Sequence, residues 1–161
     1  MKKLIAITAL ACLASATYAV EYTEIRKIIK QYSSNADVHI YDVSYQSINK
    51  QSLRHVIRDH HKLVGKSERL KDGNQLFDCD DYAFTFKAMV SCYSLLLGAN
   101  YECGVITVRQ VVKFGGIPAG GYHALNLVLM DGVLVVIEPQ TYLYAPLSEY
   151  PNRNNIIGLI L

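Results

Sequence analysis

Three residues of this 161-residue chain have types and spacing that would allow them to act together in one reaction: Cys79, His123 and Glu138. A thiol beside an imidazole that a carboxylate orients is an arrangement used in nucleophilic catalysis. Cys79 stands in the stretch FDCDDYA, directly before a run that reads as a helix. The unpaired N–H groups of a helix start lower a thiol pKa, whereas the neighbouring aspartates raise it. A nucleophilic Cys79 would therefore need a cationic partner.

Hairpin geometry indicates which histidine that partner is. The dipeptide Asp131-Gly132 joins two apolar runs, 122–130 and 133–140, and predicts a two-residue turn between antiparallel strands. In that register His123 lies diagonal to Glu138 on the same face of the hairpin, within reach of a long side chain. The spacing therefore predicts that the Glu138 carboxylate holds the His123 ring.

The same segments resemble the transglutaminase-like superfamily, and most of all its small bacterial cysteine-peptidase-like branch. The resemblance covers roughly residues 77–141, and the family usually has Asp at the position of Glu138. The matching positions are Cys79, Asp81 and Ala83, then Gly98 after the helix, then His123-Ala124, and finally Glu138-Pro139 and Thr141.

The resemblance implies a papain- or transglutaminase-like core in which Cys79 is the nucleophile and His123 the general base and acid. Glu138 would orient His123, and an acyl-thioester would form on the sulfur. The Cys79 backbone N–H and one further donor would hold the oxyanion. Gln75, four residues before the cysteine, is the candidate for that donor.

The other cysteines and histidines suggest structural roles. Cys92 and Cys103 could form a disulfide that leaves Cys79 free, although pairing of Cys79 with either of them stays open. No cysteine or histidine array has the spacing of a metal site, so no metal is expected. His60 and His61 lie among charged residues and are interpreted as a solvated helix face.

The elements that must position these residues follow from hydrophobic periodicity. Three helices come first, and strands joined by a hairpin follow, which is the α+β pattern of helices packed on an antiparallel sheet. The expected helices span 21–33, 49–64 and 78–97, and the expected strands span 101–112, 122–130, 133–140 and 156–161. The stretch 37–48 is a strand or irregular, 66–75 is a loop, and 113–121 is a flexible connection.

The leading residues predict export. Residues 1–19 have a short basic start, an apolar centre and small residues at the end, as secretory signal peptides do. Lipidation at Cys12 is the weaker alternative. Removal of this segment, with its two lysines, leaves 14 basic residues against 14 acidic ones in a single domain, 20–161. A near-neutral chain suggests no nucleic-acid partner, and we expect no stable membrane insertion after cleavage.

The combined expectation is a periplasmic or secreted, cofactor-free, thiol-dependent amide hydrolase or acyltransferase. Its partner would be a peptide or protein in the cell envelope or outside the cell. Two alternatives stay open. One is a catalytically inactive exported binding or inhibitory module of the same fold, and the other is a structural protein stapled by a disulfide.

Overall fold

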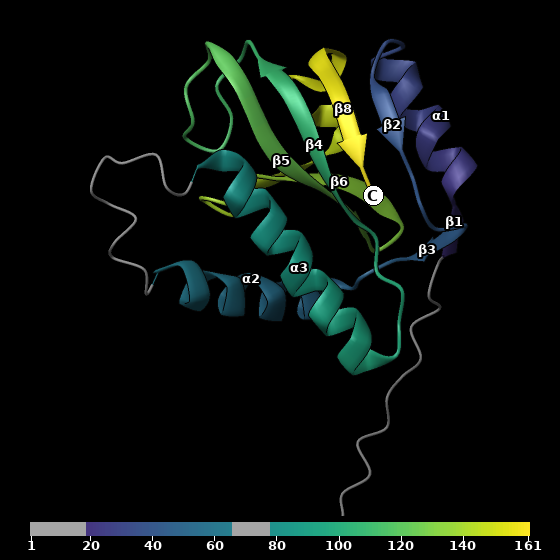
Figure 1. Ribbon diagram of the computed structural model, residues 1–161. Helices are drawn as coiled ribbons and strands as arrows, with labels where there is room; N and C mark the ends of the chain where they lie inside the picture. The colour runs from purple at the N-terminus through teal and green to yellow at the C-terminus, as the bar shows by residue number, and fades with distance from the viewer. Residues whose placement is uncertain (1–18, 66–77) are drawn as a thin grey trace, which may run out of the picture.

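A six-stranded sheet forms the centre of the molecule, with helices on both of its faces (Figure 1). The computed structural model describes residues 19–65 and 78–161. Its elements are β1 (Ala19–Glu21), α1 (Tyr22–Tyr32), β2 (Asp37–His39), β3 (Ser44–Gln46), α2 (Lys50–Gly65), α3 (Cys79–Leu97), β4 (Cys103–Gln110), β5 (Gly121–Met130), β6 (Val133–Ile137), β7 (Tyr144–Pro146), the 3-10 turns η2 (Leu147–Glu149) and η3 (Arg153–Asn155), and β8 (Ile156–Ile160).

The order of strands in the large sheet is β2-β8-β4-β5-β6-β7. β2 and β8 run parallel, and the other neighbours in this sheet are antiparallel. β1 and β3 pair separately as a small antiparallel ribbon. The central strands β4 and β5 are thereby flanked on both sides, and they form the most deeply buried part of the sheet.

Alternation along β5 divides the core into two layers, because successive side chains of a strand point to opposite faces. Leu125 and Leu127 pack in one layer with Ile25 of α1. Val128 packs in the other layer with Phe86 of α3. The sheet is therefore covered by α1 on one face and by α2 and α3 on the other, as Figure 1 also shows.

Several local predictions are confirmed. Helix α3 begins at Cys79, and the Asp81 carboxylate accepts the backbone N–H of Asp78 at 3.2 Å, as in a capping box. The helix ends at Gly98, whose φ of 62° is the left-handed conformation that glycine adopts most easily. The hairpin has the expected register, with Met130 opposite Val133.

The predicted architecture is wrong, because the sheet is mixed and its helices cover two faces. The parallel neighbour of the last strand, β8, is the three-residue strand β2, and the sequence pattern of 37–48 gave no sign of this long-range pairing. A papain- or transglutaminase-like core of helices on an antiparallel sheet is not supported. The predicted signal peptide, up to residue 18, and the connection 66–75 lie outside the described residues.

None of the helices in the described parts of the chain is long and apolar enough to cross a membrane.

Candidate functional site

The predicted contact between His123 and Glu138 is present. His123 Nε2 and Glu138 Oε2 are 2.5 Å apart, and both side chains are buried. The second carboxylate oxygen, Oε1, accepts the backbone N–H of Gln140 at 3.0 Å. Both oxygens of Glu138 therefore have partners, and the His123 ring is held in one orientation.

The loop 113–121 packs against Glu138. Gly115 has a φ of +59°, and a Cβ atom there would lie only 2.6 Å from Glu138 Cγ. The aromatic ring of Phe114 packs edge-on against Tyr150, with 4.9 Å between the ring centroids. The predicted flexible connection is thus packed against the aliphatic part of the Glu138 side chain, and it requires glycine at position 115.

Cys79 lies at the start of α3, against the opposite face of β5. Its partly buried side chain packs with Ala83 and Ala124. Ala124 and His123 are successive residues of a strand, so their side chains point to opposite faces. Within the described residues, the hydrogen bonds of the His123 ring include one to Glu138 but none to the Cys79 sulfur. The catalytic roles assigned to Cys79, His123 and Glu138 therefore stay a prediction.

The surroundings of Cys79 disfavour the thiolate. Burial raises the pKa of the Cys79 thiol, and the negative charges of Asp78 and Asp80 raise it further. The backbone N–H of Ala124 acts in the opposite direction without reversing the shift. At neutral pH the thiol is therefore mostly protonated, and a protonated thiol is a poor nucleophile.

We expect iodoacetamide to label Cys79 near neutral pH more slowly than free cysteine, with the rate rising only at higher pH. His123→Ala should leave this rate within about twofold, because the imidazole is held by Glu138 rather than by the sulfur. Mass spectrometry of the Cys79 peptide measures the rate, and the exposed Cys92 serves as the internal reference. Labelling faster than free cysteine that disappears in His123→Ala would contradict this expectation.

The remaining predicted site residues are not brought together. Cys79, Cys92 and Cys103 are all free thiols, so the suggested disulfide between Cys92 and Cys103 is not formed. Cys92 is exposed on α3 whereas Cys103 is buried under it, which explains why they do not meet. Gln75 lies outside the described residues.

His60 is not part of a solvated face, contrary to the sequence interpretation. It is completely buried, and its Nδ1 lies 2.8 Å from the hydroxyl oxygen of Tyr142. Burial lowers the pKa of His60 to about 4. The ring also packs edge-on against Phe86 of α3, so His60 is a neutral core residue that joins α2 to α3.

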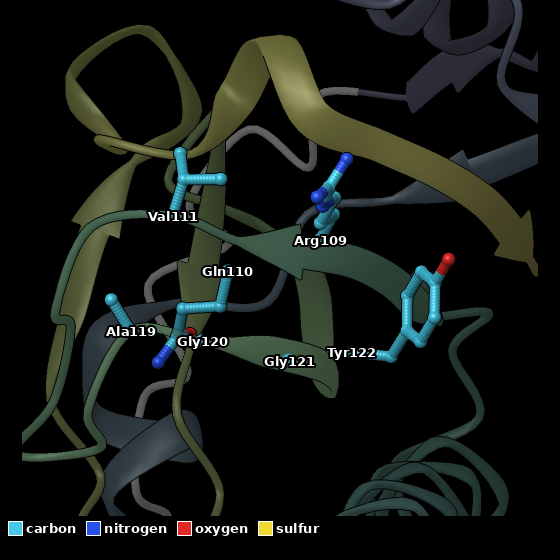
Figure 2. A pocket seen from close by; sticks show the side chains of 7 residues that line it. All are labelled: Arg109, Gln110, Val111, Ala119, Gly120, Gly121 and Tyr122. Carbon is cyan, nitrogen blue, oxygen red and sulfur yellow. The ribbon is translucent and has the colours of Figure 1, made fainter.

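A surface hollow that was not predicted from the sequence lies where β4 ends and β5 begins (Figure 2). Its volume is about 600 Å³. Arg109 and Tyr122 are opposite each other in the β4–β5 register, and Tyr122 is 74% exposed. The lining residues are Arg109, Gln110, Val111, Ala119, Gly120, Gly121 and Tyr122.

Gln110 is a buried polar residue beside this hollow, and its side chain points to the opposite face of the strands from Arg109 and Tyr122. Its Nε2 donates to the carbonyl oxygens of Ile117, at 3.0 Å, and Pro118, at 2.8 Å. The side chain is 2% exposed, and its Oε1 has no hydrogen-bond partner within the described residues. In Figure 2 the Gln110 side chain lies next to Gly120, whereas the Arg109 side chain extends in the opposite direction. The exposed groups of the hollow are thus an aromatic ring and a guanidinium.

The sequence does contain a signal for this hollow. The polar pair Arg109-Gln110 and the residue Tyr122 flank the glycine-rich connection 113–121 on its two sides. Two strands joined by such a connection form a hairpin, which places both groups at the same end of the strand pair.

The structure is similar to solved structures of lectins. It matches a complex of PSL1a with E64 at a TM-score of 0.66 and 16% identity, over 89% of this chain and 51% of the other. It also matches the Polyporus squamosus lectin bound to the human-type influenza-binding epitope Neu5Acα2-6Galβ1-4GlcNAc, at a TM-score of 0.63 and 15% identity, over 89% and 49% of the two chains. No family model and no curated protein matches the sequence.

These findings correct the predicted family, function and partner. The similar structures belong to the Polyporus squamosus lectin (PSL1a) family and not to the transglutaminase-like peptidases. The molecule bound to the second of them is a glycan rather than a peptide. Thiol-dependent hydrolysis or acyl transfer on a peptide or protein is therefore not retained. The chain spans about half the length of each of these structures, and likeness at this level of identity shows a shared fold.

Proposed function

We propose that this protein is an exported binding module that recognises a carbohydrate in the hollow between Arg109 and Tyr122. The observation that carries the proposal is the composition of this hollow: an exposed aromatic ring beside an exposed guanidinium at one end of the two central strands. Small-molecule sites combine apolar surface with a few placed polar groups that fix the ligand's orientation. That the protein is exported is part of this proposal, and it is supported by the signal-peptide pattern of residues 1–19.

A sugar ring suits such a hollow because it has an apolar face of C–H groups and a rim of hydroxyls. The ring of Tyr122 offers a rigid, amphipathic surface for the apolar face. Arg109 adds a fork of N–H donors for ring or hydroxyl oxygens.

The likeness to lectin structures supports a binding role of this kind. The second of those structures contains a bound trisaccharide. Because this chain corresponds to about half of that lectin, the carbohydrate ligand is carried over here only as a proposal.

Tyr122→Ala should weaken glycan binding about tenfold or more, because it removes the exposed ring against which a sugar would stack. A glycan array followed by titration calorimetry with the tightest-binding glycan measures the effect. Tyr41→Ala is the matched control, since Tyr41 is 77% exposed and does not line the hollow. The proposal fails if wild-type protein binds no glycan, or if the two variants lose affinity equally.

A further inference from the structure

Helix α3 is apolar on its exposed side as well as on its buried side. It packs toward the sheet through Ala83, Phe86 and Val90, which are buried. On the other side Leu95 is 84% exposed and Leu96 is 77% exposed, within the parts of the chain that the structure describes. Figure 1 shows α3 lying across the sheet with no other labelled element in front of it. A helix that is apolar on both sides is usually covered on both sides.

The outer face of α3 contains a regular seam of exposed residues. Positions 84, 88, 91 and 95 are separated by four, three and four residues, which is the spacing with which two helices pack against each other. Cys92 and Leu96 are exposed beside this seam. The seam has large side chains at its ends and small ones in its centre: Phe84, Ala88, Ser91 and Leu95.

The outer face of α3 carries no charge beyond the first turn of the helix. From residue 82 to residue 101 the sequence has one charged residue, Lys87. Its ammonium donates to the carbonyl oxygen of Cys103, at 2.6 Å, and so points toward the sheet. Helices that lie on a lipid surface have basic residues on their polar side, and contacts between different proteins are selected by complementary charges. A face with neither feature is complementary to a second copy of itself.

We propose that two copies of this chain form a reversible dimer through the outer faces of their α3 helices, which cross in an antiparallel direction. At the crossing point Ala88 of one copy lies opposite Ser91 of the other, and these small side chains let the backbones come close. Towards the ends Phe84 lies opposite Leu95. A two-fold axis makes each contact twice, as a closed dimer of identical chains requires.

The polar member of the seam can be buried without loss of a hydrogen bond. The Ser91 hydroxyl donates to the carbonyl oxygen of Lys87, at 3.1 Å, within the same helix. Contact with a second helix therefore leaves no unpaired donor at this position. The seam thus offers apolar contact at its ends and a satisfied hydroxyl at its centre.

The size of this face sets the strength of the dimer. A helix rises about 1.5 Å per residue and is about 10 Å wide, so the face from Phe84 to Leu96 covers on the order of 200 Å². Stable complexes bury about 800 Å² on each partner, so we expect a Kd on the order of 100 µM. The dimer would hold two copies of the proposed carbohydrate site, but the inference does not depend on that site.

Analytical ultracentrifugation of the whole reduced protein, from about 5 to about 500 µM, tests the dimer. Wild-type protein should be monomeric at the low end and mostly dimeric at the high end. Leu95→Glu should raise the Kd at least tenfold, because it places a charge against Phe84 of the second copy. Leu143→Glu is the matched control: this exposed leucine lies beside the edge strand β7, and its Kd should stay within about twofold of wild type. Urea unfolding verifies that both variants are folded.

A pair of opposite charges tests the antiparallel direction. Phe84→Lys alone should weaken the dimer, as Leu95→Glu does. When both substitutions are made in one chain, an ammonium lies opposite a carboxylate at each end of an antiparallel contact. The double variant should therefore associate at least threefold more tightly than either single variant. In parallel helices the like charges would meet, and the double variant would associate more weakly than both.

Three results would overturn the inference. The first is wild-type protein that stays monomeric up to about 500 µM. The second is Leu95→Glu protein that associates as tightly as wild type. The third is a double variant weaker than both single variants, which excludes antiparallel helices. Binding of monomeric protein to phosphatidylcholine vesicles, lost in Leu95→Glu, would assign this face to a lipid surface instead.

Discussion

Glu102→Gln should raise the free energy of unfolding at pH 8 by on the order of 4 kcal/mol. Glu102 is completely buried, and burial raises the pKa of its carboxyl to about 8. The backbone N–H of Leu129 and the charge of Lys87 act against this shift without cancelling it. Glutamine has nearly the same shape but carries no proton to lose.

The sign follows from the two pKa values. An unfolded glutamate loses its proton near pH 4.3, whereas the folded protein retains it until about pH 8. Between these values the folded state binds more protons, so stability is greatest below about pH 4 and falls as the pH rises. His60 acts in the opposite sense: burial lowers its pKa to about 4, so its contribution is lost on acidification from about pH 6.5.

Urea unfolding from pH 5 to pH 9 measures the effect of Glu102. The wild-type slope against pH should be largely absent in Glu102→Gln and retained in Glu149→Gln, a substitution of an exposed glutamate. Equal slopes in all three proteins would show that the buried carboxyl does not control this pH dependence.

Gly115→Ala should destabilise the protein by about 2–4 kcal/mol and disrupt the contact between His123 and Glu138. The new methyl group would lie 2.6 Å from Glu138 Cγ, and the φ of +59° adds backbone strain. Urea unfolding gives the loss in stability, and the imidazole NMR signals of His123 report the contact.

Gly116→Ala is the matched control for this experiment. Gly116 also has a positive φ, of +86°, but a Cβ atom there would meet no other atom within 4 Å. It should therefore cost only the backbone strain, about 1 kcal/mol, and leave the His123 signals in place. If both variants lose the same free energy of unfolding, then the close contact of Gly115 with Glu138 does not contribute to stability.

The sequence predicted elements with strong local signals. The aspartate before Cys79 and Gly98 after the helix mark the two ends of α3, and Asp131-Gly132 sets the hairpin register. That register alone brings His123 to Glu138. These features depend on residues that are close together in the sequence, so one amino-acid sequence is enough to predict them.

The arrangement of the elements was not predictable in the same way. Parallel pairing of β2 with β8 joins the two ends of the domain, and a three-residue strand leaves almost no pattern. Short motifs around Cys79 and His123 describe a helix start and a strand but not the fold that contains them. For this reason the resemblance led to the wrong family.

The hollow needed tertiary structure before it was visible. Arg109 and Tyr122 lie opposite each other only through the β4–β5 register. An exposed tyrosine and an exposed arginine have no distinctive sequence pattern.

The central claim, carbohydrate binding in the hollow where β4 ends and β5 begins, is tested most directly by a ¹⁵N–¹H NMR titration of the protein with the tightest-binding glycan from the array. The proposal predicts saturable shifts concentrated in the backbone amides of 109–122. Shifts centred instead on Cys79 and the first turn of α3, or a spectrum that no glycan changes, would contradict it.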